Sequence, residues 1–196
     1  MAHVPPLERS ELPEFEAMFQ RRDAASGFVA NSVLTMGRRP DILRAYQSLL
    51  DAAYHEGTVD HRLKVLVALM RSSAAGCRYC SAHTANHGAS EHDIDARKIE
   101  SIWEFETSNL FDDAERAALR LARDAAQSPN AVTEDHFVEL RRFFDDGELI
   151  EIVAVIGLFA FLNSWNDTLA TPLEDAPVSF AQEHLGSIGW ELGKHA

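Results

Sequence analysis

Apolar residues recur every three or four positions along most of this chain, which is the spacing that one face of an α-helix produces. The clearest stretch begins at Pro40 and stops before Gly57. Its apolar positions are Ile42, Leu43, Tyr46, Leu49, Leu50 and Ala53. Strand-like alternation of apolar and polar residues is nearly absent, so the pattern predicts an all-α protein.

Two predicted helices, at about residues 59–75 and 148–165, are apolar almost all round. A helix of that kind is buried on every side, so we expect both at the centre of the fold. Asp146 and Gly147 are typical turn residues and are expected to precede the second helix. Its most apolar run, residues 152–162, is much shorter than the roughly 20 residues of a membrane span, and we expect no membrane association.

Helix starts can be predicted from capping residues. Asp112 followed by Glu115 has the pattern of a capping box, in which each residue bonds the backbone of the other. Ser90 followed by Asp93 marks another expected helix start.

The pattern divides the chain into three parts. Residues 1–39 hold an arm and short helices that we expect to pack on the core. Residues 40–170 form the main helical domain, and residues 171–196 form a tail with a short helix near residues 180–185.

Composition and charge narrow the function. With 196 residues, 46% of them hydrophobic, the chain can bury a substantial core. The formal net charge is −13 and no dense cluster of Lys and Arg is present, which argues against nucleic-acid binding. The first residues, Met1 to Arg9, carry charge and lack an apolar stretch, so we expect no signal peptide and a cytoplasmic protein.

Cys77 and Cys80 are the only cysteines of the chain, and they follow Gly76. If Cys77 opens a helix, both lie on one face one turn apart, within reach of a disulfide after modest adjustment. His83 falls on the same face, one turn beyond Cys80, where it can exchange a proton with the thiol. Without export, such a pair favours catalysis or metal binding over a structural disulfide. The pattern therefore predicts a reversible dithiol with a histidine acid/base.

Other interpretations of this segment are less favoured. Two inert buried thiols fit poorly, because polar residues interrupt the apolar surface of this helix. A thioredoxin-like site would need strands around the motif. The candidate zinc ligands share one helix and cannot converge on one ion: Cys77, Cys80, His83 and His87. We therefore expect neither a metal nor a cofactor.

Two further sets of polar residues receive structural interpretations. His87 stands next to Gly88 at the expected helix end, where it is more typical of a partner for the helix dipole than of a second proton carrier. Asn163, Asn166 and Asp167 form a polar cluster at the end of an apolar helix. For these residues, capping and hydrogen bonding are favoured over catalysis.

The segment from Val59 to His87 resembles the carboxymuconolactone decarboxylase family, in particular its alkylhydroperoxidase AhpD-like branch. The shared features are the apolar helix, the small linker before Cys77, the two cysteines and the run Ala82-His83-Thr84. The resemblance extends over about residues 40–170. It implies an AhpD-like helical bundle that assembles into homo-oligomers, often trimers or hexamers.

The resemblance also implies roles for the site residues. In the AhpD-like branch the second cysteine attacks the peroxide and the first then resolves the sulfenic acid as a disulfide. Cys80 would be the peroxidatic cysteine and Cys77 the resolving one, with His83 assisting. A helix N-terminus by itself favours Cys77 as the more ionised thiol. The implied partners are a hydroperoxide and an external dithiol, which for AhpD is a lipoylated protein.

The proton relay of AhpD is incomplete in this chain. Val65 occupies the place of the relay glutamate, and Thr84 that of the relay histidine, with His83 one position short. Tyr79 replaces the histidine between the cysteines. Peroxidase activity should then be weaker than in AhpD, or the substrate different.

Three functions follow from these observations. The first is a thiol-dependent peroxidase or disulfide oxidoreductase. The second is a non-redox lactone decarboxylase, against which the intact cysteine pair argues. The third is a non-catalytic oligomeric module whose dithiol senses the redox state.

Overall fold

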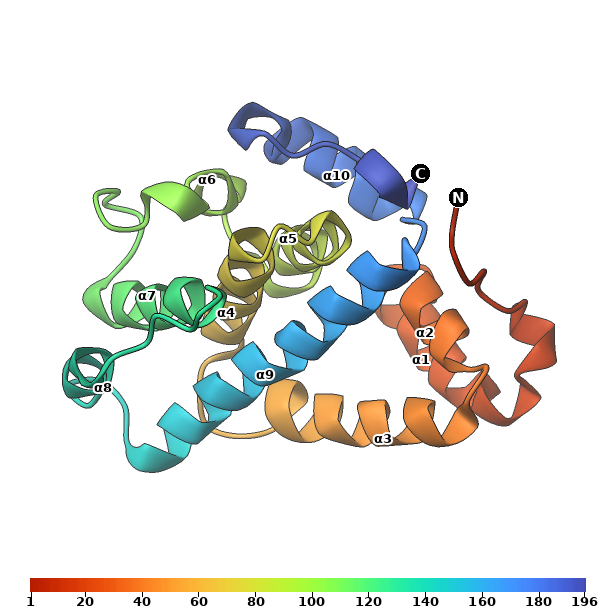
Figure 1. The fold of residues 1–196 in the computed structure, drawn as a ribbon, viewed down its shortest axis with the longest axis horizontal. Coiled ribbons are helices and arrows are strands. Elements are labelled where there is room, and N and C mark those ends of the chain that lie inside the picture. The colour runs from red at the N-terminus through yellow and green to blue at the C-terminus, as the bar shows by residue number, and fades with distance from the viewer.

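The computed structural model describes residues 1–196, and its ten α-helices with no strand confirm the all-α prediction (Figure 1). The helices are α1 (Glu16–Ser26), α2 (Asn31–Met36), α3 (Pro40–Leu50), α4 (His61–Ala74), α5 (Arg78–His92), α6 (Ala96–Glu100), α7 (Asp113–Ala125), α8 (Glu134–Leu140), α9 (Asp146–Leu169) and α10 (Asp175–His184). A π-helical turn, Asp51–His55, extends α3.

Helix α4 is the centre of the bundle and packs against α5, α7 and α9 (Figure 1). Its residues 63–70 are all buried, as the apolar pattern predicts. Helix α9 differs from that prediction, because Ile150, Val153 and Phe161 lie on its solvent side and are 69%, 41% and 40% exposed. Only one side of α9 therefore faces the core.

By length and composition alone, α9 is long and apolar enough to cross a membrane, a property it shares with core helices of soluble proteins. Its 24 residues pack on both α4 and α5. Nothing else in the fold marks the chain as a membrane protein.

A buried ion pair joins α4 to α9. Lys64 is 2% exposed, and its ammonium lies 3.0 Å from Oε2 of Glu151 and also donates to the carbonyl of Glu56. The Glu151 carboxylate accepts hydrogen bonds from the backbone N–H groups of Thr58 and Val59. One carboxylate thus fixes both the α4–α9 contact and the loop before α4.

The expected helix end at Gly88 and the expected start at Ser90 are both wrong. Helix α5 runs through both residues to His92 and ends at Asp93, which has a left-handed backbone. The glycine serves packing instead: a Cβ there would lie 2.9 Å from Cγ1 of Val65. Close approach of α4 and α5 therefore explains Gly88.

Other boundaries follow their capping residues. The Asp112–Glu115 capping box is confirmed, with 2.8 Å from the Glu115 N–H to Asp112. Helix α9 begins at Asp146 rather than after Gly147, because Asp145 and Glu148 form an equivalent box one residue earlier. The tail helix α10 is longer than the expected residues 180–185.

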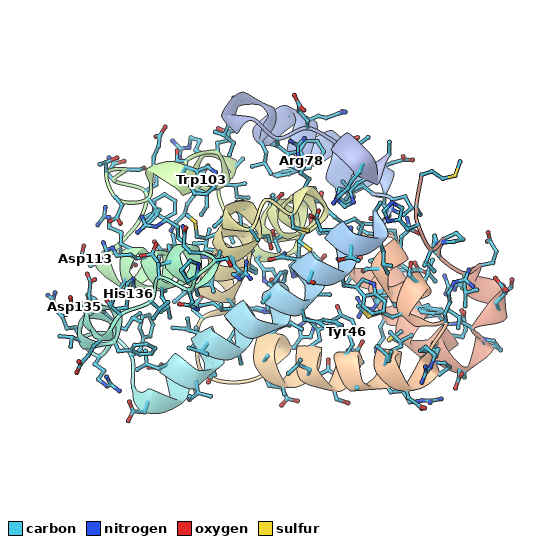
Figure 2. All side chains as sticks on the ribbon, in the orientation of Figure 1. Tyr46, Arg78, Trp103, Asp113, Asp135 and His136 are labelled. Atoms are coloured by element: carbon cyan, nitrogen blue, oxygen red, sulfur yellow. The ribbon has the colours of Figure 1, made fainter.

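The C-terminal tail folds back over the start of α5. The indole of Trp190 donates to the carbonyl of Arg78 at 3.0 Å, and the Arg78 guanidinium donates to the carbonyl of Glu191 at 2.9 Å. Figure 2 shows Arg78 beneath this tail and Tyr46 on α3 facing α9. The tail and the N-terminal helices thus lie on two sides of the cysteine helix.

Candidate active site

Cys77 and Cys80 lie at the beginning of α5. Cys77 is the N-cap residue, and its sulfur accepts a hydrogen bond from the backbone N–H of Cys80 at 3.4 Å. Gly76 has φ of 72°, a backbone conformation that favours glycine and turns the chain from α4 into α5. Both cysteines are free thiols, with residue exposures of 1% and 3%. The N-cap position brings the two sulfur-bearing residues together.

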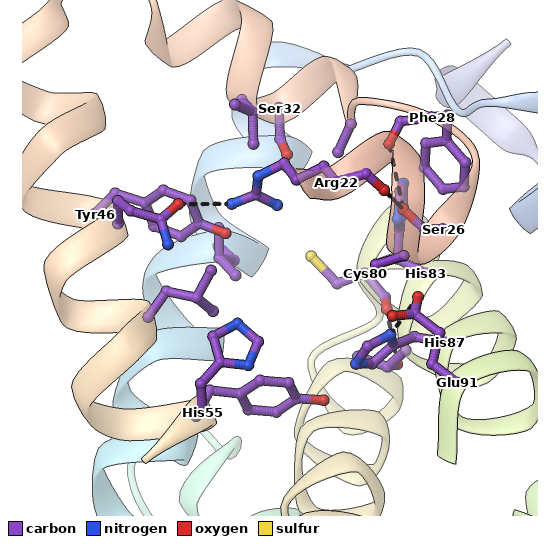
Figure 3. A pocket seen from close by; sticks show the side chains of 18 of the residues that line it. Arg22, Ser26, Phe28, Ser32, Tyr46, His55, Cys80, His83, His87 and Glu91 are labelled. Carbon is purple, nitrogen blue, oxygen red and sulfur yellow. Dashed lines mark hydrogen bonds and ion pairs between the residues drawn. The ribbon is translucent and has the colours of Figure 1, made fainter. Parts of the chain in front are cut away.

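The Cys80 sulfur points into a cavity of about 380 Å³ between α5, α9 and the N-terminal helices (Figure 3). The amide of Asn166 donates to this sulfur at 3.4 Å. Aromatic residues make up much of the wall: Phe28, Tyr46, Tyr54, Tyr79 and Phe159. The cavity is much larger than hydrogen peroxide needs and suits a small organic molecule.

Cys77 borders a second, more polar hollow between α4 and α9. Arg71, Asn163 and Asp167 line it together with Cys77. The Asn163 side chain accepts from the Arg71 guanidinium at 3.3 Å and donates to Ser72 at 3.0 Å. The two thiols therefore border different spaces.

The two thiols have opposite electrostatic environments. Burial raises the pKa of the Cys80 thiol well above its usual value. A hydrogen bond from the Cys80 side chain lowers the pKa of Cys77. Cys77 is therefore the more readily ionised of the two thiols. This agrees with the expectation from the helix N-terminus.

His83 lines the same cavity as Cys80 and pairs with Glu174, the N-cap residue of α10, at 2.6 Å. The Tyr79 hydroxyl donates to the same carboxylate at 3.1 Å. Burial alone would raise the pKa of Glu174, but its interaction with His83 and the backbone N–H of Asn31 outweigh burial and lower this pKa. Val65, at the place of the AhpD relay glutamate, is apolar and 1% exposed, and it lies against Gly88. The acidic partner of His83 is Glu174 instead.

His87 is not at a helix end, and its expected role as a dipole partner is wrong. It forms an ion pair with Glu91 at 2.8 Å, and its Nε2 lies 3.1 Å from Nε2 of His92. His55 and His61 stand beside it, and burial lowers the pKa of His61 to about 4. No group of three or more His, Cys, Asp or Glu side chains is arranged to hold a metal ion.

Two contacts of the site were missed by the sequence interpretation. Asn166 was assigned to capping and hydrogen bonding rather than to the site, yet its side chain donates to the Cys80 sulfur. Its position in a strongly apolar helix was a usable signal, because a buried amide needs a partner. Glu174 lies 94 positions beyond Cys80 in a tail with no motif, and no sequence signal pointed to it.

Comparison with known proteins gives one sequence-family match. The model of the carboxymuconolactone decarboxylase family matches residues 40–124. No curated protein sequence matches the chain.

Solved structures match over most of the chain. A cysteine-to-alanine variant of the debrominase Bmp8, in complex with 2,3,4-tribromopyrrole, is 36% identical with a TM-score of 0.84 and covers 92% of this chain and 96% of its own. An uncharacterized peroxidase-related protein with an AhpD core from Ralstonia eutropha is 22% identical, with a TM-score of 0.80 and coverages of 92% and 95%. An uncharacterized peroxidase-related protein from Silicibacter is 20% identical, with a TM-score of 0.75, and the match covers 84% of this chain and 87% of that protein. The last two likenesses are of the fold alone.

Proposed function

Because this chain belongs to the carboxymuconolactone decarboxylase family and has the fold of its AhpD-like branch, we propose that it is a dithiol oxidoreductase acting on a small organic molecule. The observation that carries the proposal is the Cys80 sulfur in a cavity with Cys77 hydrogen-bonded behind it. We expect the substrate to meet Cys80, and Cys77 to close a disulfide with it.

With a hydroperoxide, the Cys80 thiolate attacks one peroxide oxygen and the O–O bond breaks. Cys80 becomes a sulfenic acid, and the departing alkoxide takes a proton to become an alcohol. Cys77 then attacks the Cys80 sulfur, which forms the disulfide and releases water. The dithiol loses two electrons and the peroxide gains them.

Cys80 must lose its proton to attack the substrate, and burial raises its pKa. The amide of Asn166 donates to the Cys80 sulfur and partly offsets this effect of burial. The two thiols also interact, and the hydrogen bond from the Cys80 side chain lowers the pKa of Cys77.

Reductive dehalogenation is the second candidate, favoured by the likeness to a debrominase and by an aromatic cavity of about 380 Å³. Here Cys80 takes the halogen, the carbon keeps the bonding electrons and gains a proton, and Cys77 displaces halide as the disulfide forms. Electrons and atoms balance as in the peroxide reaction. The two candidates therefore share both thiols and differ only in the atom attacked.

Product analysis separates the candidates. The reduced protein is incubated with cumene hydroperoxide or with a brominated phenol, and alcohol, bromide and disulfide are each quantified. We expect one disulfide for each alcohol or bromide formed. Full turnover of a muconolactone by a Cys77→Ser, Cys80→Ser double variant would favour the non-redox alternative instead. Oxidation that alters only the assembly, without turnover, would favour the sensor.

We expect His83 rather than His87 to deliver the proton to the leaving group, because Glu174 and Tyr79 fix its orientation at the cavity wall. His83→Gln should lower kcat/KM about 100-fold or more. His87→Gln, a matched change one turn further along α5, should cost less than about tenfold. Steady-state kinetics of both variants test this assignment, and the reverse order would transfer the role to His87.

An external dithiol is proposed to reduce the enzyme through the second hollow. Cys77 borders that hollow, while Cys80 faces the substrate cavity. Thiolate attack on the Cys77 sulfur would release Cys80 first and leave the substrate cavity free. A lipoylated protein and a small dithiol are both reductants of this class.

We propose a homo-oligomer assembled through the solvent side of α9. Ile150, Val153 and Phe161 fall at helical spacing on this side, with Gly157 between them. The wild type should elute as an oligomer in size exclusion, and Ile150→Lys with Phe161→Lys should elute as a monomer. Val138→Lys, which changes an exposed apolar residue on α8, should not alter elution. A monomeric wild type would contradict the proposal.

A further inference from the structure

Arg22 is a cation in the wall of the substrate cavity. Neither the peroxide reaction nor the dehalogenation proposed above gives it a role. It lies on α1, and Figure 3 shows its guanidinium reaching into the space that the Cys80 sulfur also faces. The neighbouring Arg21 also lines the cavity but is exposed. Arg22 is thus the one partly buried arginine at the cavity.

No carboxylate pairs with Arg22. Its Nη2 donates to the neutral side chain of Gln47 at 2.9 Å, and Gln47 in turn donates to Asp51 at 2.8 Å. Glu91, the other acidic residue of the wall, pairs with His87. Both wall carboxylates are therefore engaged with other groups.

Polar atoms in the same wall lack hydrogen-bond partners. Nε of Arg22, the hydroxyl of Tyr54 and Oδ1 of Asn166 are buried and unpaired. A buried polar group without a partner is costly, so each of these groups needs a partner, which at a cavity wall can be water or a polar group of a ligand. Two of the three, the guanidinium and the hydroxyl, can donate to an anion.

We infer that Arg22 is an anion-binding residue and that the substrate is an aromatic or heteroaromatic acid, a carboxylate or an acidic ring hydroxyl or N–H. This inference rests on the proposed function and specifies its substrate class. The guanidinium holds the acidic group by charge-assisted hydrogen bonds, and the aromatic wall holds the ring beside Cys80. Hydroperoxides or halides that carry such a group are preferred over neutral ones.

Binding without turnover tests the inference separately from the chemistry. Benzoate and naphthoate carry no group that the dithiol can reduce, and benzamide and naphthamide are their neutral counterparts. Titration calorimetry with the reduced wild type should show the acids binding about 10- to 100-fold more tightly than the amides. Equal affinity for acids and amides would overturn the inference even if turnover is observed.

Variants then assign the effect to one residue. Arg22→Gln should lose the preference for the acids while binding the amides as before, and Arg22→Lys should keep part of it. Arg39→Gln, a matched change at an exposed arginine that does not line the cavity, should keep the full preference. Retained acid binding in Arg22→Gln would overturn the assignment. If Arg22→Gln does not fold, the Arg22→Lys and wild-type titrations decide.

Discussion

Cys80→Ser should lower turnover at least about 10³-fold, because a serine hydroxyl cannot replace the sulfur that accepts oxygen or halogen from the substrate. The fast phase of protein oxidation in stopped-flow measurements should disappear. Unfolding by urea should change little, because serine is similar in size. An unchanged oxidation rate would reject Cys80 as the attacking residue.

Cys77→Ser is the matched control for that variant and has a different expected result. Cys80 can still be oxidised once, so mass spectrometry should detect a sulfenic acid after one equivalent of hydroperoxide. Multiple turnover should stop, because no second thiol forms the disulfide. If instead Cys77→Ser turns over and Cys80 stays reduced, the two roles are reversed, as the lower pKa of Cys77 by itself would suggest.

Glu151→Gln should destabilise the fold by about 3 kcal/mol at neutral pH, measured by urea unfolding. The amide cannot neutralise Lys64, which is 2% exposed and lies 3.0 Å from the native carboxylate. Glu104→Gln is a suitable control, because Glu104 is exposed and makes no ion pair, and it should leave the stability unchanged within about 0.5 kcal/mol.

The effect of Glu151 should depend on pH. Burial alone would raise the pKa of Glu151, but the backbone N–H of Thr58, the ammonium of Lys64 and the N–H of Val59 together lower it from 4.5 to about 2. Because the pKa is depressed in the folded state, this stabilisation is complete above about pH 4.5 and is lost as the pH falls toward 2. The wild-type and Glu151→Gln stabilities should converge over that range. A constant difference would contradict the account of the pair.

The sequence could predict the fold class because helical periodicity is a local signal. The capping box at Asp112 and Glu115 is confirmed for the same reason. Gly88 was misinterpreted because its small size serves contact with Val65, which no local pattern reveals. The burial of α9 was overestimated because apolar residues do not all face the core: Ile150, Val153 and Phe161 lie on the solvent side of this helix.

The candidate site was only partly predictable. Its dithiol and His83 could be identified because they lie within one short motif on one helix. Glu174, Asn166 and Arg22 reach the site from α10, α9 and α1, so only the tertiary structure brings them there. The pKa difference between the thiols likewise depends on burial as well as on helix position.

The most direct test of the central claim is the ratio of disulfide to product in a single turnover. Reduced protein is mixed anaerobically with one equivalent of cumene hydroperoxide or brominated phenol, whichever it consumes faster, and free thiols are alkylated at intervals for peptide mapping. We predict one Cys77–Cys80 disulfide within the chain for each alcohol or bromide formed, at equal rates. Product formation while both cysteines remain alkylatable would contradict the account.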